Sequence, residues 1–176
     1  MVDCESTQFS QCNASAGVGS CSDSAKPIDI EARPAVVVAG AAKWDDGYKS
    51  IMAAVAKARA AVLKANLKEG GRPLAAFVDT DDDGFKYEAM IPLEAVPTSP
   101  VDLGADAKIG ATPAGKAIKF QHRGAYDDVD STYEAITAYL DEKGYEAQNV
   151  FVEEYVNDPK GSDDSSLALD IYVFIK

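Results

Sequence analysis

An acidic residue stands between two aromatic residues in the predicted strand from Asn149 to Val156. Alternation along an extended strand places Phe151, Glu153 and Tyr155 on one face and valines on the other. A carboxylate among aromatic rings suits an organic cation, because charge attraction and cation–π contact act together. The charge attraction alone is roughly 4 kcal/mol at a separation of ~4 Å and an effective dielectric constant near ~20. The pattern therefore indicates a site that selects positive charge.

The last predicted strand, Leu167 to Ile175, divides its residues between two faces in the same way. Its odd-numbered residues are aliphatic, and its even-numbered residues include an acid and two rings. If the aliphatic faces of both strands cover helices, the other sheet face is a candidate ligand-binding surface. We expect it to carry Phe151, Glu153, Tyr155, Asp170, Tyr172, Phe174, Glu88 and Met90. So many large rings need cover from a ligand, a loop or a partner, although rings on strands also commonly serve packing.

Two further aromatic residues, Trp44 and Tyr126, stand directly before acidic pairs at the predicted starts of helices. They are candidate walls of the ligand site, although residues at this position more commonly pack under the first helical turn. For His122 we expect a surface role, because no second histidine completes a metal set. The run Asp81–Gly84 lacks the later acid of a calcium loop and predicts a turn. We expect no metal or cofactor, since P-loop, G-x-S-x-G and paired Cys/His patterns are missing from the sequence.

The elements that position these residues occur twice in the same order. In residues 35–93 a β-branched run is followed by a long amphipathic helix and two strands. After a proline-containing linker, 94–114, residues 115–176 again predict strand, helix, strand and strand, with Gly144 closing the helix. We therefore predict an α+β fold, in which two pseudo-twofold-related strand-helix-strand-strand repeats form an antiparallel sheet with both helices on one face.

Residues 1–30 are rich in Ser, Asp, Gly and Ala without an apolar period, which predicts a flexible tail before a domain over 31–176. This segment holds all three cysteines, Cys4, Cys12 and Cys21, and their spacing matches neither a zinc nor a redox pattern. No stretch of the sequence is apolar enough to predict a membrane span. The first residues lack the pattern of a signal peptide, so we expect a cytoplasmic location, with export the alternative if a signal precedes this sequence.

The charge of the chain restricts its partners. Seventeen basic and 29 acidic residues give a formal net charge of −12. Such a field repels phosphate backbones, so direct nucleic-acid binding is disfavoured. An acidic surface also suits a protein partner with a basic surface, and the sequence leaves the oligomeric state open.

Four segments resemble the GyrI-like small-molecule-binding domain, also known as the effector-binding domain of bacterial transcription activators. They are Gly124–Asp128, the helix through Tyr139–Leu140 to Gly144–Tyr145, Val152–Pro159 and Asp170–Ile175. The duplicated order extends the resemblance to about Ala35. It implies two pseudo-twofold units that hold hydrophobic, often cationic, compounds in a cleft between the repeats. It also implies that the glutamate of an E-x-Y pattern, here Glu153 beside Tyr155, contacts the bound cation.

The sequence departs from that family at Phe174, where a proline is common, and it shows no helix-turn-helix before the domain. It thus resembles stand-alone members, which include a gyrase-inhibiting protein and enzymes that hydrolyse cyclopropane-bearing DNA-alkylating compounds. The leading hypothesis is a protein that binds or sequesters hydrophobic compounds, cationic ones among them, without catalysis. One alternative is a hydrolase of reactive hydrophobic compounds with Glu153 as general base. Another is a regulator of a protein partner, such as a gyrase modulator.

Overall fold

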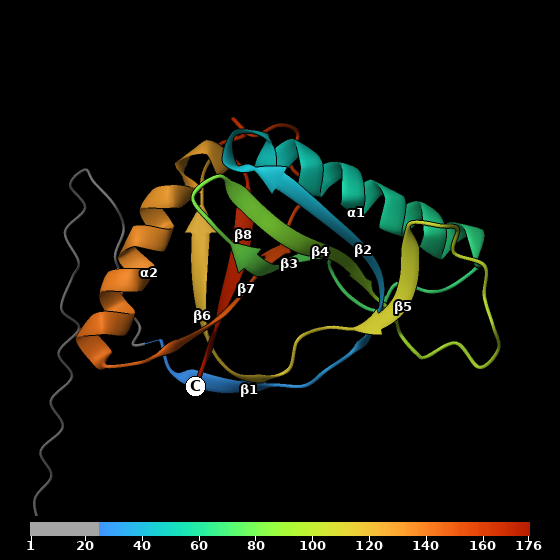
Figure 1. Cartoon of the computed structure of the whole chain (residues 1–176), viewed down its shortest axis with the longest axis horizontal. Helices are drawn as coiled ribbons and strands as arrows, with labels where there is room; N and C mark the ends of the chain where they lie inside the picture. Colours follow the sequence, from blue (N-terminus) through green and yellow to red (C-terminus); the bar gives the residue numbers. More distant parts are fainter. Residues whose placement is uncertain (1–24) are drawn as a thin grey trace, which may run out of the picture.

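Eight strands form one antiparallel sheet, and two helices cover one of its faces (Figure 1). The computed structural model describes residues 25–176. Across the sheet the strand order is β1-β6-β8-β7-β3-β4-β2-β5. The elements are β1 (Pro27–Ile30), β2 (Pro34–Lys43), α1 (Gly47–Lys64), β3 (Leu74–Thr80), β4 (Gly84–Pro92), β5 (Ala107–Ala111), β6 (Gly115–Arg123), α2 (Val129–Lys143), β7 (Ala147–Tyr155) and β8 (Ala168–Ile175). This architecture confirms the predicted α+β fold.

The two repeats are β2-α1-β3-β4 and β6-α2-β7-β8, and they meet where β3 pairs with β7 at the centre of the sheet. A 3-10 turn precedes each helix at the equivalent place: η1 (Trp44–Asp46) before α1 and η2 (Tyr126–Asp128) before α2. Each repeat is also preceded by a short strand that pairs with the other repeat. Strand β1 pairs with β6, and β5 pairs with β2. The outer strands therefore link the two halves of the domain.

These outer strands differ from the expected boundaries. Residues 27–30 were expected in the tail but form β1, and residues 107–111 were expected in the linker but form β5. Each strand is too short to show an apolar period of its own, and its hydrogen-bond partners lie far along the chain. Residues 1–24 of the predicted tail, which include its three cysteines, lie outside the described residues.

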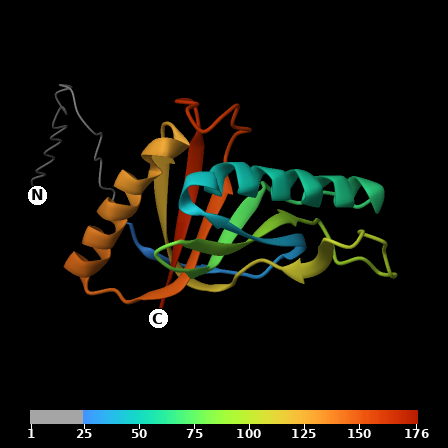
Figure 2. The same ribbon diagram turned by 45° about the horizontal axis from the view of Figure 1, so that its top comes forward.

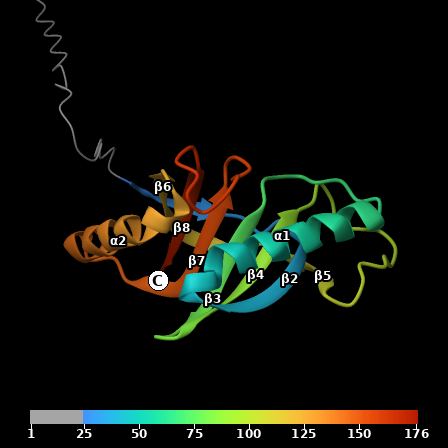
Figure 3. The same cartoon turned by 90° about the horizontal axis from the view of Figure 1, so that it is seen from above.

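The larger core lies between the sheet and the helices, and we call it the helix-face core. Helix α1 packs on β2 and β4 through Ile51, Val55 and Val62, and its buried alanines allow close approach to the sheet. Helix α2 contributes Ile136 and Leu140. Figure 3 shows both helices from above, on the same side of the strands. Neither helix of the described residues is long and apolar enough to cross a membrane.

A second, smaller group of buried residues lies on the other face of the sheet, and we call it the opposite-face cluster. Its members are Ala35, Val37, Leu74, Ala76, Met90, Ala117, Val152 and Phe174. Strand β1 and the segment after it run along the side of the molecule away from α1 (Figure 2). The two faces of the sheet thus have different cover, helices on one and an extended segment on the other.

Candidate functional site

Glu153 lies on the central strand β7, with its side chain on the helix side of the sheet. In the ladder it is opposite Ala75 of β3 and Ile171 of β8, and both of these residues belong to the helix-face core. Only 1% of Glu153 is exposed. Charged residues are seldom buried to this degree unless they are paired or hydrogen-bonded. The surroundings of this carboxylate therefore decide what it does.

Three phenol groups donate hydrogen bonds to the Glu153 carboxylate. Tyr133 Oη of α2 lies 2.8 Å from Oε1, while Tyr126 Oη of η2 and Tyr155 Oη of β7 lie 3.1 and 3.2 Å from Oε2. We call these three residues the tyrosine triad. Within residues 25–176 no lysine, arginine or histidine forms an ion pair with Glu153. The site is thus a buried acid that is hydrogen-bonded but has no counter-charge.

Burial is the main influence on the titration of this site. It raises the pKa of Glu153 from an ordinary 4.5 to about 7, although the three phenol donors lower the pKa in part. Burial, followed by the negative charge of Glu153, raises the pKa of each triad tyrosine well above 10. The phenols therefore stay protonated near neutral pH, whereas Glu153 exchanges a proton there. A positive charge placed beside Glu153 would stabilise its ionised form.

Aromatic side chains from both repeats meet next to the triad. Half-buried Tyr48 of α1 packs on Tyr126, with ring centroids 5.2 Å apart, and Phe151 packs on Tyr133 at 6.1 Å. Figure 3 shows that the first turn of α1 lies near the middle of the sheet. Burial raises the pKa of Tyr48, and the negative charges of Asp164 and Asp163 on the loop after β7 raise it further. The rim of the site is therefore aromatic and acidic, as an organic cation requires.

The structure divides the predicted binding surface between the two faces of the sheet. Phe151, Glu153 and Tyr155 lie on the helix side, together with Tyr126. The opposite side carries Glu88, Met90, Asp170, Tyr172 and Phe174. The expectation that the valines of β7 cover the helices is wrong, because Val152 belongs to the opposite-face cluster. The strand pairing explains the difference: residues directly opposite in a ladder share a face, and Glu153 is opposite Ile171.

Most predicted residues on the opposite face already have partners. Asp170 is 4% exposed, and Lys119 Nζ lies 2.8 Å from its Oδ2. Glu88 lies 3.6 Å from Lys108 Nζ, and Met90 and Phe174 are buried among the apolar side chains of the cluster. We therefore assign the helix-side group around Glu153, and not this second group, as the candidate site.

Trp44 lies beside the turn between β3 and β4. Its ring packs on Phe85 with centroids 5.0 Å apart, and Nε1 donates to the carbonyl oxygen of Asp81 at 3.0 Å. The residue remains 51% exposed. Its place in the repeat corresponds to Tyr126, but the structure gives it no contact with the carboxylate of Glu153. The Asp81 carboxylate in turn accepts from the backbone of Asp83 and Gly84, which confirms the predicted turn.

His122 is buried, so the expected surface role is wrong. It is 4% exposed, and its Nε2 lies 3.0 Å from the carbonyl oxygen of Ala125. Because a carbonyl only accepts, Nε2 carries a proton, and in the neutral ring Nδ1 then accepts from the Thr132 hydroxyl at 2.8 Å. This side chain joins the end of β6 to the start of α2. It thereby positions the turn that carries Tyr126.

The sequence did not single out Tyr133, which makes the shortest bond to Glu153. Its spacing from Ile136 and Leu140 placed it on the buried face of the helix. A hydroxyl on an otherwise aliphatic helix face was the available signal, since a buried phenol needs a hydrogen-bond partner. Which acid it would meet depended on how α2 packs on the sheet.

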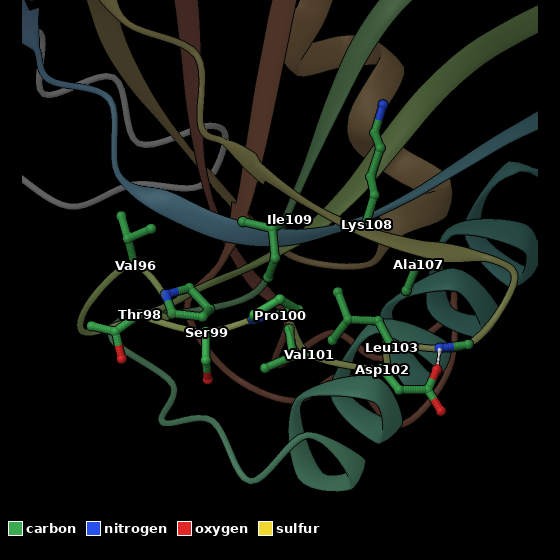
Figure 4. A pocket seen from close by; sticks show the side chains of 12 residues that line it. Val96, Thr98, Ser99, Pro100, Val101, Asp102, Leu103, Ala107, Lys108 and Ile109 are labelled. Atoms are coloured by element: carbon green, nitrogen blue, oxygen red, sulfur yellow. Dashed lines mark hydrogen bonds between the residues drawn. The ribbon is translucent and has the colours of Figure 1, made fainter.

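A groove of about 600 Å³ lies away from Glu153, between residues 96–104 of the linker and β5 (Figure 4). Exposed apolar residues such as Val96 and Ile109 line it. Its one carboxylate, that of Asp102, is paired with Lys64 Nζ at 2.8 Å. Lys64 thereby compensates the charge of the one carboxylate in the groove, so the groove is a weaker candidate than the surroundings of Glu153.

Comparison with known families gives one match. A family model described as the GyrI-like small molecule binding domain matches residues 27–176. The matched range begins with β1 and includes every described strand and helix. No curated protein sequence matches the chain.

Several solved structures have a similar fold. The EcmrR C-terminal domain has a TM-score of 0.70 at 15% identity, over 86% of this chain and 96% of that one. The structure of SAV2435 bound to tetraphenylphosphonium has a TM-score of 0.58 at 14% identity, over 86% and 93%. A hydrolase from Listeria innocua has a TM-score of 0.60 at 13% identity, over 86% and 91%. At these identities the likeness is one of fold.

Proposed function

We propose that this chain, which belongs to the GyrI-like family of small-molecule-binding domains, binds hydrophobic organic cations beside Glu153. The observation that carries the proposal is the Glu153 carboxylate itself. It is 1% exposed, accepts from three phenols and has no ionic partner within residues 25–176. A buried carboxylate without a counter-charge is unfavourable for the folded protein, and a ligand that supplies the counter-charge removes that penalty.

The shape of the ligand follows from the side chains around the carboxylate. Tyr48, Tyr126 and Phe151 present ring surfaces from α1, η2 and β7. Such rings favour a cation whose charge is spread over an apolar body, because a compact hydrated ion would lose its water without compensation. SAV2435, a structure of similar fold, is described as bound to tetraphenylphosphonium, a cation of this kind. Because Glu153 is so little exposed, one of the covering rings moves when such a ligand reaches it.

Calorimetric titration with tetraphenylphosphonium tests this function. The wild type is compared with Glu153→Gln, which removes the charge and keeps the shape. The matched control is Glu134→Gln, which removes one exposed carboxylate from α2. We expect the cation to bind the wild type and the control equally and to bind Glu153→Gln at least about tenfold more weakly, since about 1.4 kcal/mol of lost attraction has that effect. Equal affinity for Glu153→Gln would remove the role proposed for this residue.

A second function has one specific observation in its favour. A general base is most effective when its pKa lies near the working pH, and the pKa of Glu153 is about 7. In this alternative Glu153 removes a proton from a water molecule that attacks a strained electrophile. Incubation with a cyclopropane-bearing alkylating compound separates the two functions. Catalytic turnover that Glu153→Gln abolishes would establish the hydrolase, whereas stoichiometric binding without product would exclude it.

A further inference from the structure

A separate cavity of about 480 Å³ lies on the face of the sheet opposite the helices. We call it the opposite-face cavity and define it by Ile30, Leu74, Val152, Glu154, Tyr172 and Phe174, which line it. Its apolar wall is part of the opposite-face cluster. Its volume lies within the range of ordinary small-molecule sites, which is roughly 300 to 1,000 Å³. It shares no lining side chain with the tyrosine triad.

The outer wall of this cavity is the segment from β1 to β2, residues 28–33. Two hydrogen bonds, one to a side chain and one between backbone groups, hold it in place. Arg33 N donates to Thr112 Oγ1 at 2.9 Å, and Thr112 N donates to the Arg33 carbonyl oxygen at 2.8 Å. Pairing of β1 with β6 holds the other end of the segment. The wall is therefore a bonded part of the domain and keeps the cavity in shape without a ligand.

Glu154 places a carboxylate in this apolar surrounding. Its side chain is 17% exposed, and its nearest ionic partner within residues 25–176 is Arg72, with Nη1 3.8 Å from Oε1. The Arg72 side chain is 53% exposed, so solvent weakens this long contact. Lys119 also acts on this side of the cavity, with Nζ 5.7 Å from the centroid of the Tyr172 ring, but its close ion pair is with Asp170 at 2.8 Å. Glu154 is thus an acid of this cavity with only a long, solvent-weakened ion pair.

Tyr172 lies beside Glu154 and completes the polar side of the cavity. Burial raises the pKa of the Tyr172 phenol, and the negative charge of Glu154 raises it further. An aromatic ring next to a carboxylate combines the two groups that attract an organic cation. At the mouth, Glu31 adds a second acid, while Asp29 is paired with Lys116 at 3.3 Å. Three acids and one base, Arg33, line the cavity. This excess of negative charge and the apolar wall together favour a compact cation with an apolar body.

We propose that the opposite-face cavity is a second ligand site, which binds compact quaternary ammonium compounds that carry an aromatic ring. The ammonium lies against Glu154 and Tyr172, and the ring lies against Leu74, Val152 and Phe174. Because neighbouring residues of a strand point to opposite faces, Glu153 and Glu154 serve two sites on the two sides of β7. This second site does not depend on the function proposed for Glu153.

Methyl-resolved NMR of the full chain tests the proposal with benzyltrimethylammonium as the probe. Its neutral control is neopentylbenzene, in which carbon replaces the ammonium nitrogen. The methyls of Ile30, Leu74 and Val152 report on the opposite-face cavity, and those of Ile136 and Leu140 report on the helix side. We expect the first set to shift and saturate with the cation, in the wild type and in Glu153→Gln alike. The neutral control should bind at least about tenfold more weakly, because it lacks the charge that Glu154 attracts.

Two variants make the outcome decisive. Glu154→Gln removes the charge and should weaken cation binding at the first methyl set about tenfold, while the helix-side methyls respond as in the wild type. Ile30→Trp fills the cavity and should abolish the response, and its helix-side methyl spectrum shows whether the domain is folded. The proposal is overturned if the opposite-face methyls do not respond, if Glu154→Gln binds as the wild type does, or if the neutral compound binds equally well. If Glu153→Gln loses only the response of the helix-side methyls, the proposal of a second site stands, because the opposite-face methyls still respond.

Discussion

Replacing Glu153 with glutamine should change how the stability of the protein depends on pH. The folded state raises the pKa of Glu153 from 4.5 to about 7, so between these values the folded protein binds a proton that the unfolded chain has released. The contribution of this group to stability is fully present below about pH 4.5. It decreases as the pH rises and is lost once the pH has passed about 7. The full change is roughly 3 kcal/mol, at about 1.4 kcal/mol for each pH unit between the two pKa values.

Urea denaturation between about pH 5 and about pH 8 measures this effect, and we expect the wild type to lose roughly 2 to 3 kcal/mol relative to Glu153→Gln over that range. The comparison uses the pH slopes of the two proteins, because the amide also changes the hydrogen bonds of the tyrosine triad. Glu134→Gln, an exposed change on α2, corrects for the loss of one carboxylate and should keep the wild-type slope. Parallel slopes for wild type and Glu153→Gln would show that the carboxylate titrates alike in the folded and unfolded chain. The reasoning from burial would then be refuted.

Three further results are expected. Tetraphenylphosphonium should bind the wild type about tenfold more tightly at pH 8 than at pH 6. The reason is that the ionised fraction of a group with a pKa of about 7 rises about tenfold over this range. Calorimetry of Glu153→Gln should show no such pH dependence. Tyr133→Phe removes the 2.8 Å donor to Glu153, so it should raise the pKa of Glu153 further. It should also lower the free energy of unfolding at pH 8, measured in urea, by about 1 to 3 kcal/mol. A pH midpoint of the stability change equal to that of the wild type would contradict this. His122→Ala leaves Thr132 and the Ala125 carbonyl without their buried partner. It should lower the free energy of unfolding by about 2 kcal/mol. A decrease of less than ~0.5 kcal/mol would show that His122 does not hold the start of α2.

Patterns that depend on neighbouring residues were readable from the amino-acid order. The apolar period of α1 and α2, the turn at Asp81 and the left-handed Gly144 at the end of α2 (φ 70°) all follow from local preferences. The repeat of strand, helix, strand and strand follows from the same preferences applied twice. They led to the α+β fold, and Glu153 emerged because it interrupts an aromatic alternation on one strand.

The face on which Glu153 lies was decided only by strand pairing. Alternation separates the two sides of β7, but it does not say which side meets a helix. A shift of one residue in the ladder exchanges the faces, and the ladder joins residues far apart in sequence. The pairing of Glu153 with Ala75 and Ile171 settles this point.

The remaining features have the same physical origin. Tyr133 reaches Glu153 only because α2 packs on the helix side of the sheet, and β1 and β5 are strands only because a distant strand supplies their hydrogen bonds. The amino-acid order by itself determined which segments are helices and strands and which acid stands among aromatic residues. The tertiary structure alone decided that this acid is buried beneath three phenols, because burial depends on contacts between residues that are remote along the chain.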